Sequence, residues 1–121
     1  MESDRNELGR RGEDVALRFL LDKGMVLVAR NWRNGHLEID LIMDDGRVLR
    51  IVEVRSLSYP NDYDPFESVG YWKRRKIIKA ARRFISVTGC CKEVVFDVVS
   101  VVFNGDVYRL EYFPDAYTTD W

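Results

Sequence analysis

The sequence is poor in the residue types that mark several common classes of protein. It contains two cysteines, Cys90 and Cys91, and one histidine, His36. Adjacent cysteines rarely bond to each other and two thiols make no zinc site, so we interpret both as free thiols. His36 has no histidine or cysteine cluster beside it, and we expect it at the surface. Nothing in the sequence supports a Ser/His/Asp triad or a glycine-rich phosphate loop.

Long apolar segments are scarce as well. No run approaches the ~20 residues that a membrane-spanning helix needs, and the polar segment 1–11 is unlike a secretory signal. We therefore expect a cytoplasmic protein. The 121 residues, without repeats, low-complexity segments or linkers, suit one domain. We predict that it spans 1–121, with irregular tails over 1–6 and 115–121.

The chain does have enough apolar residues for one core, and its charge is unevenly distributed. It is 46% hydrophobic and 32% charged, with a net charge of −1 that argues against a generic nucleic-acid binder. Between Tyr71 and Phe84, however, there are seven basic residues and no acidic one, which leaves −8 on the remainder. Such segregation can steer a polyanion to one face.

Apolar residues at a 3.6-residue period predict a first helix over 7–23, ended by Gly24. Glu13 lies at the edge of its apolar stripe, and from position alone a solvated carboxylate is the simpler interpretation. Gly9 and Gly12 lie on or beside the stripe. Because glycine weakens a helix, they suggest the close approach of another backbone.

A second helix is predicted from Asp64 to about Val87. Asp64 and Glu67 would form a capping box, with Pro65 at the first helical position. Gly89 is placed to end the helix.

Five strands are predicted, with the ranges 25–30, 36–43, 47–55, 93–103 and 107–113. Segments 31–35 and 56–64 are predicted loops, and Asp45-Gly46 is a strong hairpin signal. The order of helix, three strands, helix and two strands predicts an α/β fold, with a mixed sheet of about five strands flanked by helices.

Charged residues interrupt two of the predicted strands. Asp40 and Glu53 would lie on adjacent strands, where burial is costly unless the charges are paired or hold a metal. Alternation places Asp40 opposite Ile39 and Leu41. Hard cations such as Mg²⁺ prefer carboxylate oxygens, remove the repulsion between them and activate water for attack on a phosphate. The spacing leaves open a simple ion pair between Glu53 and Arg55.

An ordered set of motifs accompanies this pair along the chain. The motifs are Leu8-Gly9-Arg10-Arg11-Gly12-Glu13, Asn31-Trp32-Arg33, Glu38-Ile39-Asp40-Leu41-Ile42, Val52-Glu53-Val54, Lys73, Ala80-Ala81 and Phe96-Asp97-Val98-Val99. Together they resemble the YraN-like family, a small bacterial branch of the PD-(D/E)xK nucleases, over nearly the full length. The resemblance implies a restriction-endonuclease-like fold, Asp40 and Glu53 as ligands of Mg or Mn, and Glu13 as a helix glutamate that faces the site.

The chain departs from the family pattern at two positions. The usual pattern is Glu-Val-Lys-x-Arg, whereas this chain has Arg55 in the lysine position and Leu57 in the arginine position. An arginine stays protonated and cannot serve as a base, although it can contact a phosphate. The departures leave open whether catalysis is retained.

The second predicted helix adds a cation and a basic face. Lys73 falls within the apolar arc, so we predict that it reaches Glu53 or Asp40; the alternative is that it extends past the sheet edge to water. The opposite side carries Arg75, Lys76, Lys79, Arg82 and Arg83, with Trp72 near them. We predict that these residues bind nucleic acid, with Trp72 stacking on an unpaired base. The alternative is a solvated helix face.

The sequence therefore predicts a Mg- or Mn-dependent nuclease acting on DNA, with branched or single-stranded structures as candidate substrates. Asp40 and Glu53 would hold the metal, assisted by Glu13, while Arg55 and Lys73 supply positive charge. A second hypothesis is a non-catalytic nucleic-acid-binding module on the same fold. A third is a protein-interaction domain that docks a nucleic-acid partner through its acidic part. A homodimer would suit the cutting of two strands, by fold-level analogy.

Overall fold

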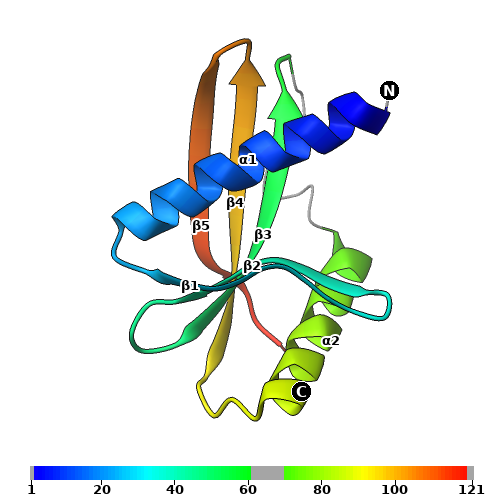
Figure 1. The fold of residues 1–121 in the computed structure, drawn as a ribbon, viewed down its shortest axis with the longest axis vertical. Helices are drawn as coiled ribbons and strands as arrows, with labels where there is room; N and C mark the ends of the chain where they lie inside the picture. The colour runs from blue at the N-terminus through cyan, green and yellow to red at the C-terminus, as the bar shows by residue number, and fades with distance from the viewer. Residues whose placement is uncertain (1, 61–69, 120–121) are drawn as a thin grey trace.

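The computed structural model describes residues 2–60 and 70–119. Two helices and five strands lie in these ranges (Figure 1), in the order α1 (Glu2–Asp22), β1 (Val26–Asn34), β2 (Leu37–Asp44), β3 (Leu49–Ser58), α2 (Tyr71–Thr88), β4 (Val94–Asn104) and β5 (Val107–Tyr117). The predicted α/β fold, a mixed sheet flanked by helices, is confirmed. Neither helix has the length and apolar character that crossing a membrane requires.

The five strands form one sheet in sequence order, β1-β2-β3-β4-β5. Strands β3 and β4 are parallel and the other neighbours are antiparallel. A parallel pair needs a crossover connection, and α2 lies in the one between β3 and β4. Figure 1 shows α1 crossing one face of the sheet, with α2 on the other side of the β1–β2 hairpin. The two helices thus cover opposite faces.

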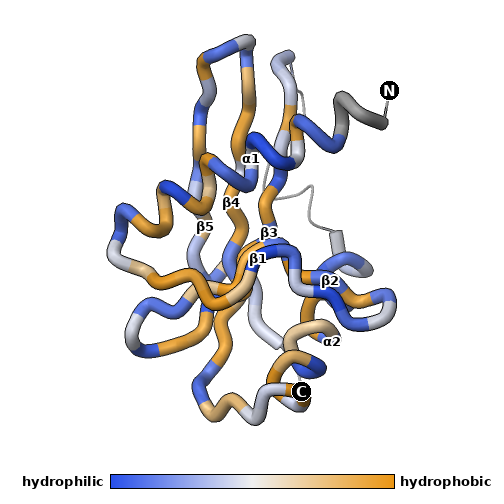
Figure 2. Tube along the Cα trace, viewed as in Figure 1, coloured by the Kyte–Doolittle hydropathy of each residue, from blue (hydrophilic) through white to orange (hydrophobic). Residues whose placement is uncertain are grey.

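Two apolar layers hold the helices on the sheet (Figure 2). The layer under α1 contains Ala16, Leu20, Leu41, Met43, Val52, Val99, Val101 and Phe103. The layer under α2 contains Ile39, Ile42, Leu49, Ile51, Ile77, Ala80, Ala81, Phe84, Phe96 and Val98. Full burial of each large apolar side chain contributes about 1.5–3 kcal/mol. Strand β3 contributes to both layers, which is typical of a buried central strand.

The helix ends differ in part from the predictions. Helix α1 begins at Glu2, so the predicted irregular tail over 1–6 is wrong from that residue onward. Gly24 ends α1 as predicted, with a φ of 95° that favours glycine. In the same region the Met25 N–H donates to the Leu20 carbonyl at 3.2 Å, which satisfies one of the free carbonyls of the last turn.

Helix α2 ends as predicted and begins later than predicted. Gly89, with a φ of 69°, follows the last turn, and its N–H donates to the Ile85 carbonyl. Gly70 has an extended backbone and precedes the first helical residue, Tyr71. A continuous helix from Asp64 is therefore wrong, and the predicted capping box itself lies outside the described residues.

Three strands are longer than predicted. Backbone pairing with a neighbouring strand extends each of them over residues that have no apolar alternation. Strand β1 pairs with β2 as far as Asn34, so the predicted loop over 31–35 is wrong at 31–34, and Gly35 lies in the turn that follows. Strand β3 pairs with β4 to its last residue, Ser58. Strand β5 reaches Tyr117, so the predicted tail over 115–121 is wrong at 115–117.

A buried carboxylate ties β3, β4 and β5 together. Asp97 is fully buried and accepts hydrogen bonds from Arg50 at 3.1 and 3.2 Å. The Tyr112 hydroxyl and the Asp115 N–H donate to the same carboxylate at 2.6 and 2.8 Å. Arg50 also contacts Asp45, in the turn between β2 and β3, at 2.8 Å. Because its donors are supplied by the fold, Asp97 acts as a structural link.

Candidate functional site

The site begins where β2 and β3 separate. The ladder between these strands ends at the pair Leu41 and Val52. Beyond that pair, the Asp40 Oδ2 atom accepts the Val54 N–H at 2.9 Å. The carboxylate takes the place that a backbone carbonyl would hold in a continued ladder. Asp40 is therefore attached to β3 at the mouth of a fork between the strands.

Side-chain alternation along β2 also breaks at Asp40. Ile39 and Ile42 pack on the α2 side of the sheet, whereas Leu41 packs on the α1 side. The prediction that Leu41 shares a face with Ile39 is therefore wrong, since strict alternation holds only in a regular strand. The irregularity turns the Asp40 side chain toward the backbone of β3.

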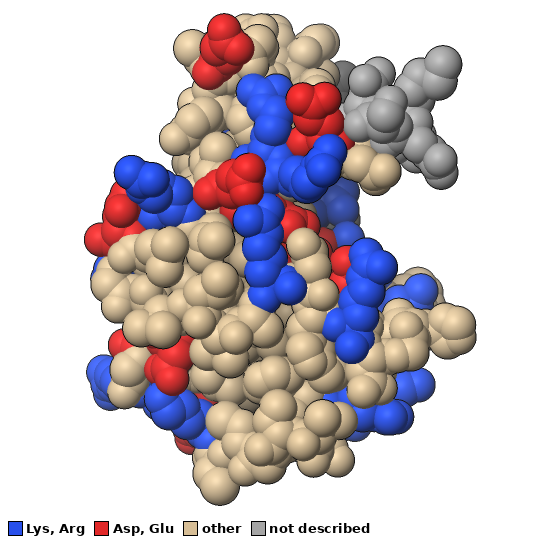
Figure 3. All heavy atoms as spheres, viewed as in Figure 1, with Lys and Arg blue, Asp and Glu red and all other residues tan. Residues whose placement is uncertain are grey.

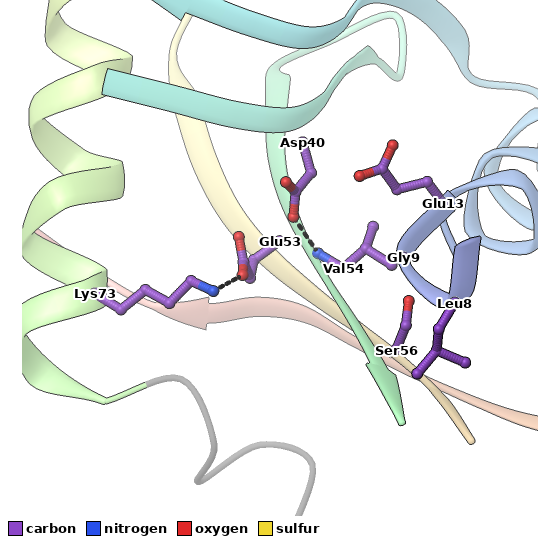
Figure 4. A pocket seen from close by; sticks show the side chains of 8 residues that line it. All are labelled: Leu8, Gly9, Glu13, Asp40, Glu53, Val54, Ser56 and Lys73. Atoms are coloured by element: carbon purple, nitrogen blue, oxygen red, sulfur yellow. Dashed lines mark hydrogen bonds and ion pairs between the residues drawn. The ribbon is translucent and has the colours of Figure 1, made fainter. Parts of the chain in front are cut away.

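Glu53 lies beside Asp40 on β3 and is buried. The two carboxyl groups lie close together in the fork, where two negative charges repel each other (Figure 4). Burial, followed by repulsion from Glu53, raises the pKa of Asp40 to about 8, against the lowering effects of the Val54 N–H and Lys73. Without a cation, the pair therefore holds a proton at neutral pH.

Lys73 reaches this pair from α2, as predicted. Its Nζ atom lies 2.5 Å from Glu53 Oε1 (Figure 4). The Lys73 side chain is 44% exposed, so it remains partly accessible to water while it contacts the buried Glu53. The structure thus favours the predicted ion pair over extension past the sheet edge.

Glu13 approaches from α1, on the other side of the fork. Its side chain points toward Asp40 in Figure 4 and is 15% exposed, so the simpler interpretation of a solvated carboxylate is wrong. Arg30 Nε and Asn31 Nδ2 both donate to its Oε1 atom, at 3.2 and 3.1 Å. Burial, followed by repulsion from Asp40, raises the pKa of Glu13.

The close approach of α1 to β3 depends on one of its two glycines. A Cβ atom on Gly12 would lie 1.7 Å from Ser56 Oγ, whereas one on Gly9 would meet no described atom within 4 Å. The predicted close approach is therefore confirmed at Gly12 and wrong at Gly9. Gly9 instead lines the open side of the site.

These side chains line one pocket of about 310 Å³ (Figure 4). Its described lining residues are Leu8, Gly9, Glu13, Asp40, Glu53, Val54, Ser56 and Lys73. Arg55, the predicted cationic residue of β3, is half-buried and is not among them. Four of the five predicted metal-site and catalytic residues thus meet in the pocket.

The donor set of the pocket suits a hard divalent cation. Asp40 and Glu53 supply carboxylate oxygens to the lining of the same pocket, from adjacent strands. Within residues 2–60 and 70–119, no group of three His, Cys, Asp or Glu residues has an arrangement that could hold a metal. Mg²⁺ commonly takes one or two carboxylates and completes its shell with water and substrate phosphate. The two carboxylates fit such an ion, with Glu13 farther away.

The predicted nucleic-acid residues lie on the outer face of α2. Its basic residues Arg75, Lys76, Lys79, Arg82 and Arg83 are all exposed, and Trp72 is 74% exposed. The ring of Trp72 lies edge-on to Tyr71 at 5.0 Å. Arg75 Nη1 donates to the Tyr71 hydroxyl at 3.0 Å. The helix therefore presents an aromatic pair at the start of its basic face.

Positive side chains also gather on the face that carries α1. In Figure 3, Lys and Arg side chains lie beside and partly over Asp and Glu side chains near the centre of this face. The acidic groups near the centre of this face are thus bordered by positive charge, which reduces the repulsion that a polyanion would meet there.

Sequence reasoning identified Asn31 and Arg30 neither as site residues nor as partners of Glu13. Asn31 was placed in a loop, and Arg30 at the end of a strand. Arg30 also contacts Asp14, 2.9 Å from its Nη2 atom. The only signal in the sequence is that Asn31 begins a motif of the resemblance and Arg30 precedes it. Contacts between distant segments leave no periodic pattern.

Comparison with known proteins places this fold and pocket in a known group of sequences. A family model described as "Uncharacterised protein family UPF0102" matches residues 12–101. A UPF0102 protein of Anaeromyxobacter dehalogenans is 38% identical over 117 residues, 96% of this chain and 87% of the relative. Another, of Desulforapulum autotrophicum, is 36% identical over 121 residues, 99% of this chain and all of the relative. The match thus includes every carboxylate of the pocket.

Proposed function

This chain belongs to the uncharacterised protein family UPF0102, the YraN family, and we propose that it is a divalent-metal-dependent nuclease that hydrolyses phosphodiester bonds in DNA. The observation that carries the proposal is the meeting of the Asp40 and Glu53 carboxyl groups in an open pocket, with the Lys73 ammonium on one of them. Such a buried acid pair weakens a fold, and a strongly raised carboxyl pKa in a pocket, as for Asp40, is typical of functional sites.

Each residue of the pocket has a role in this proposal. Asp40 and Glu53 would hold Mg²⁺ or Mn²⁺, with Glu13 as a third and more distant carboxylate. Such an ion, when bound, supplies an activated water and stabilises the negative charge that develops on the phosphate. Lys73 orients Glu53 through their ion pair and adds positive charge beside it. Arg55 stays protonated, so its role is restricted to charge stabilisation or phosphate contact.

The outer face of α2 supports a nucleic-acid substrate. Lysine and arginine side chains that contact phosphates release bound counterions, which favours association with DNA. Lys73, on the inner side of the same helix, adds positive charge at the pocket itself. The exposed Trp72 ring offers a stacking surface for an unpaired base. DNA with single-stranded or branched segments therefore fits this surface.

A second candidate function is a nucleic-acid-binding module without catalysis. The position of Arg55 favours it, because the residue in the usual lysine position of the resemblance is not among the described lining residues. In that case the carboxylates would still bind a cation, and DNA would bind without being cleaved.

A cleavage assay with duplex, single-stranded and branched DNA, in Mg²⁺ or Mn²⁺, tests the two candidates. We expect metal-dependent cleavage that Asp40→Asn abolishes. If the second candidate is right, wild-type protein will bind DNA without cleaving it. A gain of cleavage in Arg55→Lys would show that the arginine attenuates the site.

Glu38→Gln provides the matched control. Glu38 lies two residues before Asp40 on β2, is exposed, and contacts Arg33 at 3.5 Å. This variant removes one carboxylate from the same strand outside the pocket, so its cleavage rate should equal that of the wild type. Cleavage by Asp40→Asn at the wild-type rate would overturn the assignment of the site.

A further inference from the structure

Glu13 is held from one side by two neighbouring residues of β1. Arg30 Nε and Asn31 Nδ2 donate to the same oxygen, Oε1, at 3.2 and 3.1 Å. Because both bonds act on one oxygen, they fix the carboxylate by that atom, while the side chain as a whole points toward Asp40 (Figure 4). The orientation of Glu13 therefore depends on β1 as well as on its own helix.

Asn31 occupies an unusual backbone position for this contact. Its φ is 52°, in the left-handed region, although it lies within β1 and its neighbours Arg30 and Trp32 pair with β2. Asparagine is among the few residues other than glycine that adopt this region readily. A left-handed residue inside a strand is retained only where surrounding structure holds it, and such positions concentrate at functional sites.

Arg30 does not neutralise Glu13 completely, because it is shared. Its Nη2 atom lies 2.9 Å from Asp14 Oδ1, while its Nε bonds to Glu13. One guanidinium thus faces the carboxylates of two successive residues of α1. Glu13 is thereby held in place at the edge of the pocket by a cation that it shares with Asp14.

We propose that Asn31, assisted by Arg30, is a positioning residue that presents Glu13 to a divalent cation held by Asp40 and Glu53. This inference rests on the proposed function. The described part of the chain has no three-carboxylate metal group, so Asp40 and Glu53 would hold the cation and Glu13 would add negative charge beside it. Residues that orient the groups around a metal in this way set its affinity, typically by 10–100-fold.

Calorimetric titration of the full chain with Mn²⁺ tests the inference, using Asn31→Gly and Asn31→Asp. Glycine tolerates the positive φ and removes only the amide, so the fold is kept. We expect the affinity for Mn²⁺ to fall about 10-fold or more in Asn31→Gly. Asn31→Asp also tolerates this backbone region, and we expect a larger loss, because a carboxylate would face Glu13 Oε1 in place of a donor.

Asn34→Asp is the control, since it adds the same charge to the same strand at a residue that does not line the pocket. It should bind Mn²⁺ as the wild type does. Thermal unfolding without metal distinguishes the proposed positioning role from a structural contact that only attaches α1 to β1. If Asn31→Gly loses stability yet binds Mn²⁺ with wild-type affinity, the inference is overturned. If the wild type binds no Mn²⁺, the proposed function fails and the inference fails with it.

Discussion

At the scale of single residues, the two central carboxylates each serve both the fold and the site. Asp40 accepts the Val54 N–H and faces Glu53, and Glu53 in turn binds Lys73. Removing Asp40 therefore alters a contact between β2 and β3, and removing Glu53 alters a contact between β3 and α2, together with the chemistry of the pocket. For each variant of these residues, the folded fraction of the protein has to be measured together with its activity.

Gly12 tests the packing that brings Glu13 to the site. We expect Gly12→Ala to lower the free energy of unfolding by about 1–3 kcal/mol, because its Cβ would lie 1.7 Å from Ser56 Oγ and 2.7 Å from Ser56 Cβ. Urea denaturation measures the change. The double variant with Ser56→Gly removes both contacts and should recover part of the loss.

Gly9→Ala is the matched control in the same helix. No described atom lies within 4 Å of the added Cβ, so only the helix propensity changes. We expect a gain of about 0.5–1 kcal/mol in the free energy of unfolding. Equal effects at Gly9 and Gly12 would contradict the close contact between α1 and β3.

At the scale of elements, α2 divides its two faces between the core and the solvent. Its buried residues are Ile77, Ala80, Ala81 and Phe84, and its opposite face is basic. The same helix therefore stabilises the fold, carries Lys73 to the pocket and presents the proposed DNA-binding surface. Changes on its outer face are expected to affect binding without disturbing the core.

Reversing Arg75, Lys79 and Arg82 to Glu should abolish DNA binding, because attraction to phosphates becomes repulsion. For the single variant Lys79→Gln, we expect the slope of log affinity against log salt to become shallower by about 0.9. Fluorescence anisotropy with labelled DNA at several salt concentrations measures both effects.

The control for this helix is Arg109→Gln on β5, where the arginine is also exposed. It removes one positive charge at a distance from α2 in the sequence and should leave the salt slope unchanged. If reversing the three residues of α2 leaves DNA affinity at the wild-type value, α2 is not the binding surface, and the third hypothesis of docking through acidic residues gains support.

At the scale of the whole molecule, the site makes stability depend on pH. The pKa of Asp40 is raised to about 8 in the folded protein, from a model-peptide value of 3.8. The folded chain therefore keeps a proton that the unfolded chain releases above pH ~4. Without metal, we expect the free energy of unfolding to fall by about 1–3 kcal/mol as pH rises from 5 to 7.5. Urea denaturation at several pH values measures this slope.

Two controls identify the source of that dependence. Asp40→Asn removes the titrating group and should flatten the slope, and the raised pKa of Glu13 leaves a smaller slope of the same sign. Saturating Mn²⁺ should stabilise the protein more at pH 7.5 than at pH 5, because a cation binds the deprotonated pair. A stability that rises with pH in metal-free wild-type protein would contradict the shared proton.

Local sequence patterns by themselves determined the order of the elements and several points of the site. The 3.6-residue period located both helices, Gly24 and Gly89 marked their ends, and Asp45-Gly46 marked the hairpin. These features are readable because turn chemistry and side-chain periodicity act between residues close in the chain. The same reasoning placed Lys73 against the carboxylates, since a lysine in an apolar arc needs an acidic partner.

Only the tertiary structure decided how the carboxylates are held. Asp40 bonds to a backbone N–H 14 residues away, and Glu13 is fixed by a residue 17 positions away. The fork between β2 and β3 also moved Leu41 to the opposite face from the one that alternation predicts. Such contacts depend on how whole strands and helices pack, and no local period encodes them. The sequence therefore determined which acidic groups the site contains, and packing decided which backbone groups and side chains hold them in place.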